Sequence, residues 1–266
     1  MKALILAAGF GRRLKPITDR IPKTLIKIRN KPILGHILSN IKKCKIKDVV
    51  IVTGYKDELI KDYVGSGEKW GLHISYCHND KYNVTENIYS VKLASQELQG
   101  DDFILINADD LFPHTIISKM MKTHGQIVIA VDGEGTLGSE EMKVRRENGR
   151  ITSVTKKMDP TVAFGEDIGI TKFSREGGQA FFNTINDIIE EKGPNYYFQE
   201  AIDQLASNDY PVTYVNVENE PWIEIDDHFD LKWANIPISH MILDRIRAFG
   251  KRIKSMKRRK KNHKTK

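Results

Sequence analysis

The chain has 266 residues, of which 40% are hydrophobic and 29% charged, enough to bury one large α/β core. No apolar run reaches the ~20 residues that span a bilayer, and the run at 3–8 has no cleavage-type region after it, so we expect no signal peptide. The net charge is +7, but residues 251–266 hold ten Lys or Arg and no acids, which leaves −3 on residues 1–250 and argues against nucleic-acid binding.

The first half alternates β-rich runs with helical patterns. We expect strands at 2–8, 49–55, 72–77 and 103–110, and helices at 33–44, 57–64 and 85–99. In the helix at 33–44, Ile33, Ile37 and Ile41 recur at helical spacing, and Thr85 is a suitable N-cap for the helix at 85–99. This alternation predicts βαβ crossovers and an α/β fold with a mostly parallel central sheet flanked by helices.

The two cysteines, Cys44 and Cys77, give neither a metal-binding spacing nor a disulfide framework. This usage favours a reducing compartment, so we expect a cytoplasmic protein.

The second half has a different pattern. A hairpin is predicted at 143–156 around the turn Glu147-Asn148-Gly149, followed by helices at 179–191 and 198–206 and strands at 211–217 and 221–225. We therefore expect one domain over 1–236, with a nucleotide-binding half at 1–135 and an acceptor-side half containing the hairpin at 136–236.

A basic amphipathic helix is predicted after Pro237. Ile242, Ile246 and Phe249 recur at helical spacing, with basic residues between them. Two interpretations of residues 237–266 stay open: a helix docked on the body with a basic end, or a helix lying on an anionic membrane surface, at the inner face of the membrane.

The stretch LILAAGFGRRLKPITDRIPKTL (4–25) places a Gly9-x-Gly11 turn at the carboxyl end of the first strand, where ligands bind in open parallel sheets. Glycine allows close backbone approach to an anion. The dinucleotide pattern G-x-G-x-x-G fails because Leu14 holds the third position. A phosphate loop and a tight turn both remain possible, and Arg13 and Lys23 favour a nucleoside triphosphate.

Acidic residues end two predicted strands. Asp109 and Asp110 close the strand at 103–110, and WIEIDDHFDL (222–231) supplies Glu224, Asp226 and Asp227. Buried unpaired carboxylates are costly, whereas carboxylate oxygens are good Mg²⁺ ligands. The alternative is that Asp226 or Asp227 caps the following helix.

These residues resemble a known family. LAAGFGRRL followed by IPKTL is similar to the signature of nucleoside-diphosphate-sugar pyrophosphorylases and related nucleotidyltransferases, and NDKYNVTENIYSVKLA (79–94) resembles a segment of phosphocholine cytidylyltransferase-like proteins. The resemblance covers residues 1–235 and implies a Rossmann-like nucleotidyltransferase fold. Glu86 departs from it, since relatives often have Asn there, and so does Asn107, where some have an acid.

The resemblance also implies site residues. Arg13 and Lys23 would be catalytic, and Mg²⁺ would be held by Asp109 and Asp226. Nucleotide contacts would come from Leu6, Ala8, Gly9, Gly11, Arg13, Lys23 and Asp109. Acceptor contacts would come from Asn87, Tyr89, Lys143, Lys156 and Glu224.

The implied activity is transfer of a nucleotidyl group, with CTP favoured, to a phospho-alcohol such as phosphocholine, with release of pyrophosphate. A sugar 1-phosphate or inositol 1-phosphate is the alternative acceptor. A choline acceptor would need aromatic faces around its quaternary ammonium. The candidates, which could instead belong to the hydrophobic core, are Tyr82, Tyr89, Phe164, Tyr197 and Trp222. A non-catalytic, membrane-tethered nucleotide-binding module is the hypothesis of another class, and it would need a damaged loop or damaged acids.

Overall fold

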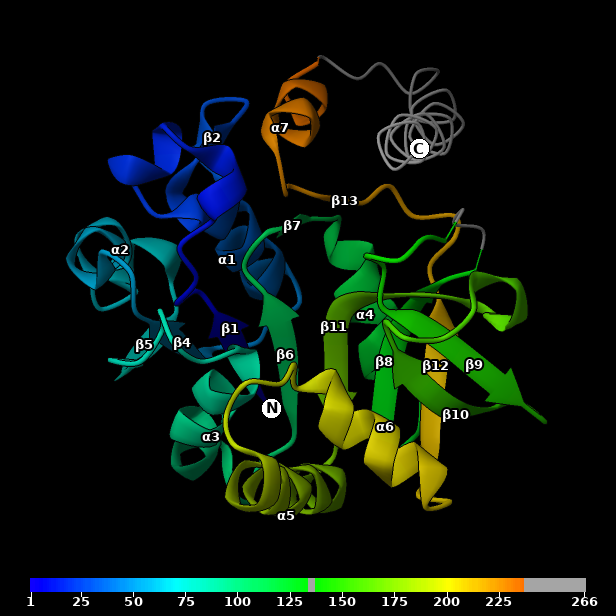
Figure 1. Ribbon diagram of the computed structural model, residues 1–266. Coiled ribbons are helices and arrows are strands. Elements are labelled where there is room, and N and C mark those ends of the chain that lie inside the picture. The colour runs from blue at the N-terminus through cyan, green and yellow to red at the C-terminus, as the bar shows by residue number, and fades with distance from the viewer. Residues whose placement is uncertain (134–136, 237–266) are drawn as a thin grey trace.

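The computed structural model describes residues 1–133 and 137–236, and a nine-stranded sheet runs through them (Figure 1). The strand order is β10-β9-β11-β6-β1-β4-β5, and β8 pairs with both β11 and β12. The strands are β1 (Lys2–Leu6), β4 (Asp48–Thr53), β5 (His73–His78), β6 (Phe103–Asn107), β8 (Ile127–Asp132), β9 (Lys143–Glu147), β10 (Arg150–Thr155), β11 (Gly165–Phe173) and β12 (Val212–Asn216).

Strands β5, β4, β1 and β6 are parallel neighbours, with Leu4 opposite Val50 on one side and Leu105 on the other. β11 runs antiparallel to β6, β8 and β9 and joins the strands of the second half to the same sheet. The expected mostly parallel sheet flanked by helices is confirmed, with this antiparallel extension.

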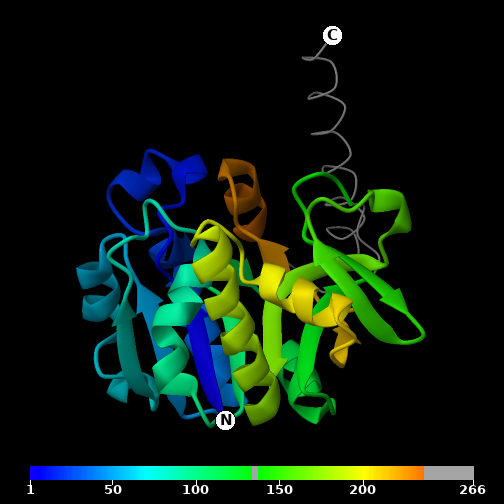
Figure 2. The same cartoon turned by 60° about the horizontal axis from the view of Figure 1, so that its bottom comes forward.

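Helices cover both faces of the sheet because the side chains of each strand alternate between them. Ala3 and Ile5 of β1 belong to one core with α1 (Ile33–Lys43), α2 (Asp57–Val64) and α4 (His114–Lys122). Leu4 belongs to the other core with α3 (Asn87–Leu98), α5 (Arg175–Lys192) and α6 (Gln199–Ser207). Figure 2 shows α3 and α5 side by side in front of the sheet.

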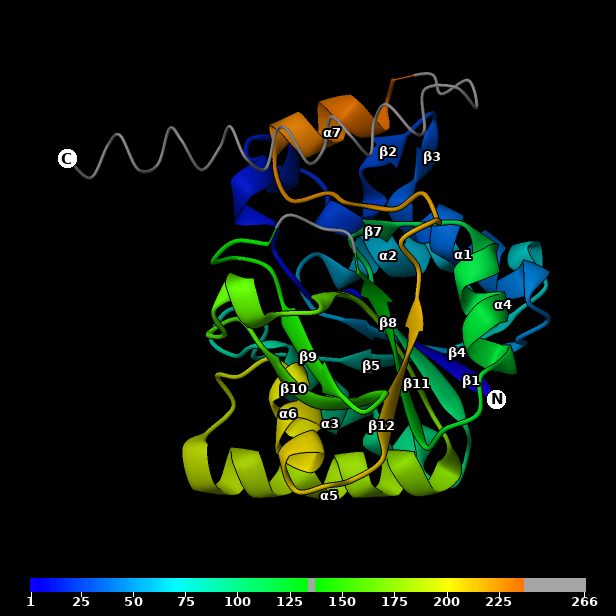
Figure 3. The ribbon, with the colours of Figure 1, turned by 90° about the vertical axis from the view of Figure 1, so that its right-hand side faces the viewer.

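Short elements gather at the carboxyl end of the parallel strands. Two-stranded pairs form between β2 (Lys27–Ile28) and β3 (Lys31–Pro32), and between β7 (Asp110–Leu111) and β13 (Ile223–Glu224). α7 (His228–Ala234) follows β13 and lies beside β2 and β3 in Figure 3. Five 3₁₀ turns complete the described part, at Arg12–Leu14, Ile17–Asp19, Lys23–Leu25, Glu68–Trp70 and Pro160–Val162.

One predicted cap is wrong. α3 begins at Asn87, with Glu86 at the N-cap position, and the Thr85 hydroxyl donates instead to the Lys81 carbonyl at 2.9 Å. That bond closes the preceding turn, so Thr85 belongs to the loop. The hairpin is confirmed, and Asn148 and Gly149 both have positive φ at its two-residue turn.

Two predictions fall where the structure gives no description. The helix expected after Pro237 lies outside the described residues, and so does the boundary expected at 135. The division into halves therefore stays a prediction. In the part of the chain that is described, every helix is too short or too polar to cross a bilayer.

Candidate active site

A cavity of about 1570 Å³ opens above the carboxyl ends of the parallel strands. Most of the predicted site residues line it, although they come from distant parts of the chain. They are Leu6, Ala8, Gly9, Gly11, Arg13, Lys23, Asn87, Asp109, Lys156, Glu224 and Asp226.

The loop after β1 bends tightly around Lys23. Gly11 has φ +70°, and a Cβ atom added there would lie 2.8 Å from Cβ of Lys23. The Thr18 hydroxyl donates to the Gly11 carbonyl at 3.0 Å and holds this bend. Gly11 is therefore required by both its backbone conformation and the close approach of Lys23. Around Gly9, by contrast, a Cβ atom would meet no heavy atom within 4 Å.

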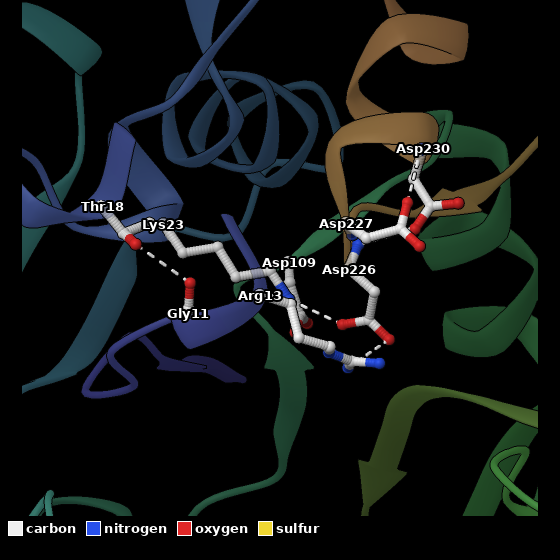
Figure 4. A network of polar contacts seen from close by, with 8 residues as sticks. All are labelled: Gly11, Arg13, Thr18, Lys23, Asp109, Asp226, Asp227 and Asp230. Carbon is white, nitrogen blue, oxygen red and sulfur yellow. Dashed lines mark hydrogen bonds and ion pairs between the residues drawn. The ribbon is translucent and has the colours of Figure 1, made fainter. Parts of the chain in front are cut away.

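Two remote carboxylates converge on the Lys23 ammonium. Nζ of Lys23 lies 2.7 Å from Oδ2 of Asp109 and 3.0 Å from Oδ1 of Asp226, as Figure 4 shows. Nη2 of Arg13 lies 2.6 Å from Oδ2 of Asp226. The two strand-end acids of the sequence thus meet at the basic loop.

Pairing of β7 with β13 explains this convergence. Glu224 stands opposite Asp110 in the two-stranded ladder, and the Ile225 amide donates to the Asp109 carbonyl at 3.0 Å. Because these bonds fix the two backbones in register, Asp109 and Asp226 face the same part of the cavity.

The charges of this network support one another. Burial alone would lower the pKa of Lys23, but Asp109 and Asp226 raise it above its ordinary value. Burial alone would raise the pKa of Asp226, but Lys23 and Arg13 hold it below its ordinary value. Lys23 and Asp226 therefore remain ionised near neutral pH.

Glu224 adds a third carboxylate to this place. Its ligand oxygen and those of Asp109 and Asp226 all lie within 4.8 Å of one another. Glu224 is exposed on the cavity wall, yet desolvation by the surrounding protein and the charges of Asp109 and Asp226 raise its pKa to about 8. Mg²⁺ prefers carboxylate oxygens as ligands, and three carboxyl groups meet here. The residues present therefore fit that ion.

Asp226 and its neighbour have separate tasks. Oδ1 of Asp227 accepts the amides of Phe229 and Asp230 at 2.8 and 3.1 Å, and Oδ2 of Asp230 accepts the Asp227 amide at 3.0 Å, which completes a capping box. The capping alternative therefore holds for Asp227, whereas the Asp226 side chain points to Lys23 and Arg13 (Figure 4).

Among the residues predicted to contact the acceptor, Asn87 joins two elements. Its Oδ1 accepts the Phe198 amide at 2.7 Å, which ties the start of α3 to the segment before α6. The Lys156 ammonium lies 4.5 Å from the centroid of the Tyr197 ring. Both Asn87 and Lys156 line the cavity, as does the Tyr197 side chain.

Two predicted acceptor residues lie off the cavity wall. Lys143 is fully buried and donates to the carbonyls of Gly138 and Glu141 at 2.8 and 3.0 Å, so it supports a loop that lines the cavity. The Tyr89 ring lies beneath the Lys81 ammonium, 5.5 Å away. A direct contact of either residue with an acceptor stays a prediction.

A buried polar pair was not predicted. Nε2 of Gln199 donates to Oδ2 of Asp167 at 3.0 Å, and the Gly169 amide donates to Oδ1 of Asp167 at 3.1 Å. Burial raises the pKa of Asp167 to about 6. The signal in the sequence was the pair of acids, Glu166 and Asp167, in a strand that also contains Lys172.

Residues 2–158 match the family model described as "Nucleotidyl transferase". The chain belongs to the nucleotidyl transferase family. The resemblance seen in the sequence and the expected Rossmann-like nucleotidyltransferase fold are thereby confirmed.

Two relatives illustrate the family. The chain is 26% identical over 254 residues (90% of this chain, 39% of the relative) to a CMP-5'-(3-aminopropyl)phosphonate synthase of Streptomyces rubellomurinus. It is 39% identical over 110 residues (41% of this chain, 45% of the relative) to a choline-phosphate cytidylyltransferase of Streptococcus pneumoniae. In each case the matched part is less than half of the relative's length.

The fold is similar to that of the inositol-1-phosphate CTP transferase from T. maritima. The two chains superpose with a TM-score of 0.69 at 19% identity, over 90% of this chain and 97% of the other.

Proposed function

We propose that this protein is a Mg²⁺-dependent cytidylyltransferase that joins the CMP unit of CTP to a phospho-alcohol and releases pyrophosphate. The observation that carries the proposal is the convergence of Asp109, Asp226, Lys23 and Arg13 beside the Gly9–Gly11 loop. Fixed positive and negative groups at the end of a parallel sheet suit a triphosphate together with a metal ion.

The chemistry needs positioning more than proton transfer. An oxygen of the acceptor phosphate forms a bond to the α-phosphorus of CTP, the bond from that phosphorus to the bridging oxygen breaks, and pyrophosphate leaves with the electron pair. The nucleophile is already anionic near neutral pH, so no general base is required. Arg13 and Lys23 stabilise the charge that moves onto pyrophosphate.

Mg²⁺ would be held by Asp109 and Asp226, with Glu224 as a third oxygen donor. When bound, the ion supplies charge neutralisation at the phosphates. Lys23 now occupies the space between the two aspartates, so its ammonium has to share or leave that position when the ion binds.

Two relatives and the sequence support CTP and a phospho-alcohol. Both relatives are named for cytidylyl products or reactions, and TENIYS (85–90) resembles the cytidylyltransferase segment. A sugar 1-phosphate or inositol 1-phosphate is the second candidate acceptor, favoured by the polar side chains of Asn79, Asn87 and Asn195 on the cavity wall.

A pyrophosphate-release screen tests the proposal. It crosses four nucleoside triphosphates with phosphocholine, phosphoethanolamine, aminoethylphosphonate, inositol 1-phosphate and glucose 1-phosphate, with Asp109→Ala as the inactive control. We expect release with CTP and one of the first three acceptors, only when Mg²⁺ is present. CTP binding without release in any combination would instead favour the non-catalytic module.

Membrane contact is a separate proposal from the sequence alone. Residues 238–266 are strongly basic, and we expect them to bind anionic vesicles. Deleting them should abolish sedimentation with phosphatidylserine vesicles and leave turnover in solution unchanged. Equal sedimentation of the shortened protein would contradict this.

A further inference from the structure

The loop after β1 presents backbone donors to the cavity. We call residues 9–11 the triphosphate loop, and all three of them line the cavity. None of their amides bonds to an acceptor in the described part of the chain. Amides in such a run can surround the oxygens of a phosphate, but they stabilise it best when the loop is held in place before the ligand arrives. What holds this loop therefore matters for binding.

The turn that follows β4, at 54–56, lies directly against the triphosphate loop. The Tyr55 amide donates to the Ala8 carbonyl at 3.1 Å, and a Cβ atom added at Gly54 would lie 2.9 Å from the same carbonyl oxygen. Glycine thus permits the close approach of the two segments. Lys56 has φ +49°, a conformation that a residue with a side chain keeps only where its surroundings impose it. The turn is a fixed support for the loop.

The Tyr55 ring packs on the middle residue of the triphosphate loop. Its centroid lies 4.1 Å from that of the Phe10 ring, and the Lys15 ammonium lies 5.2 Å from the Phe10 centroid. Contacts of both kinds are attractive. Phe10 lines the cavity, whereas Tyr55 is not among the lining residues. Tyr55 thus contacts the loop from behind and can act on a ligand only through other residues.

The Tyr55 hydroxyl reaches the far end of the same bend. It donates to the Thr18 carbonyl at 2.7 Å, and the Thr18 hydroxyl donates in turn to the Gly11 carbonyl at 3.0 Å. Thr18 is fully buried, so these bonds are costly to lose. Tyr55 therefore holds the loop at three points: the Ala8 carbonyl, the Phe10 ring and, through Thr18, the Gly11 carbonyl.

We propose that Tyr55 is a positioning residue, which fixes the triphosphate loop in the conformation that receives the phosphates of the nucleotide. This rests on the proposed function and adds a residue to its nucleotide site. Tyr55 acts through Phe10 and Thr18, because it lies behind the cavity wall. Its loss should weaken the binding of a triphosphate more than that of a monophosphate, which has fewer phosphate oxygens for the loop to hold.

The test measures equilibrium binding of CTP and of CMP, each with Mg²⁺, by calorimetry. Tyr55→Phe keeps the ring on Phe10 and removes only the hydroxyl. We expect it to weaken CTP binding about three- to tenfold, as for the loss of one hydrogen bond, and to change CMP binding little. Tyr76→Phe is the matched control, because the Tyr76 hydroxyl also donates to a backbone carbonyl at 2.7 Å, that of Gly65, and Tyr76 does not line the cavity.

A second variant tests the path through Thr18. Thr18→Val removes the hydroxyl that bonds to the Gly11 carbonyl, so it should weaken CTP binding as Tyr55→Phe does. Because the two bonds act in series, the double variant should lose less than the product of the two single losses. In turnover, KM for CTP should rise in both single variants while KM for the acceptor stays near that of the parent.

Several results would overturn the inference. CTP affinity that is unchanged in Tyr55→Phe is one, and equal weakening of CTP and CMP is another. The same loss of CTP affinity in Tyr76→Phe would show a general effect on stability instead. Losses that multiply in the double variant would contradict the path through Thr18. In each case, pyrophosphate release by the parent protein leaves the proposed function standing, whereas a parent protein that binds no nucleoside triphosphate overturns both.

Discussion

The two walls of the cavity differ in how their charges are satisfied. We define the nucleotide wall as Arg13, Lys23, Asp109, Glu224 and Asp226. Three ion pairs join its cations to its carboxylates, each with an N···O distance of 3.0 Å or less. Another part of the lining, which we call the acceptor wall and define as Glu86, Lys156, Tyr197 and Gln199, has fewer such contacts: Glu86 is exposed and has no ion pair among the described residues, and the buried Oε1 of Gln199 has no donor there.

This difference separates two ways of building a site. The nucleotide wall holds its charges in place through its own contacts, so it is organised before any ligand arrives. The acceptor wall holds fewer of its charges through its own contacts, so we expect it to be the part that selects among acceptors. Substitutions on the first wall should therefore affect all acceptors alike, whereas those on the second should discriminate among them.

The largest effect is expected on the nucleotide wall. Asp226→Asn should lower kcat for pyrophosphate release by about 10²–10³-fold, as for the loss of one pre-organised electrostatic group. Asp227→Asn is the matched control, because it removes the neighbouring charge but keeps a good N-cap for α7. Equal loss in both variants would show that the effect is general to this segment.

Lys23→Met should destabilise the protein by about 3 kcal/mol, since it leaves Asp109 and Asp226 close together without their shared cation. Addition of Mg²⁺ should raise the thermal midpoint of this variant more than that of the parent, because the ion replaces the lost charge. Lys27→Met, at an exposed position in β2, serves as the control. A midpoint of Lys23→Met that is insensitive to Mg²⁺ would contradict a metal site here.

A pH effect is expected below the acceptor wall. The pKa of Asp167 rises from 3.8 to about 6 on folding, so protonation favours the folded state. This contribution is fully present below about pH 3.8 and is lost as pH rises through about 6. Asp167→Asn lacks it, so its unfolding free energy relative to the parent should increase by about 2 kcal/mol between pH 4.5 and 7.5 in urea titrations. A constant difference would mean that Asp167 ionises normally.

Gly11→Ala should have the smallest of these effects, about 1–2 kcal/mol of stability, because alanine is strained at positive φ. Its Cβ also meets Lys23, so we expect a higher KM for CTP. Gly9→Ala has open space and should leave both the thermal midpoint and KM near those of the parent. Equal KM values for the two variants would remove the link between the Gly11 bend and Lys23.

The nucleotide wall could be predicted because its signals are local. Gly11, Arg13 and Lys23 lie in one short segment after β1, and Asp109 and Asp226 each follow a strand pattern. Their meeting point at the end of the sheet follows from parallel topology. The sequence could not show which of the two neighbouring aspartates, Asp226 or Asp227, caps α7. That depends on the path of the backbone after β13.

The acceptor wall could not be predicted in full because its contacts join distant segments. Gln199 meets Asp167 through the packing of α6 on the sheet, which leaves no local pattern. β11 was missed because Glu166, Asp167 and Lys172 interrupt its apolar run, and only its position between other strands buries it. Lys143 has a charged side chain of the kind that binds ligands, but its ammonium donates to two backbone carbonyls instead.

The central claim is that Asp109 and Asp226 hold a divalent cation beside the triphosphate loop. Titration of Mn²⁺ in the presence of CTP, followed by electron paramagnetic resonance, tests it on the parent protein and on Asp226→Asn and Asp227→Asn. The account predicts one site that Asp226→Asn weakens by at least about tenfold and Asp227→Asn leaves intact. Mn²⁺ affinity that is the same in all three proteins would contradict it.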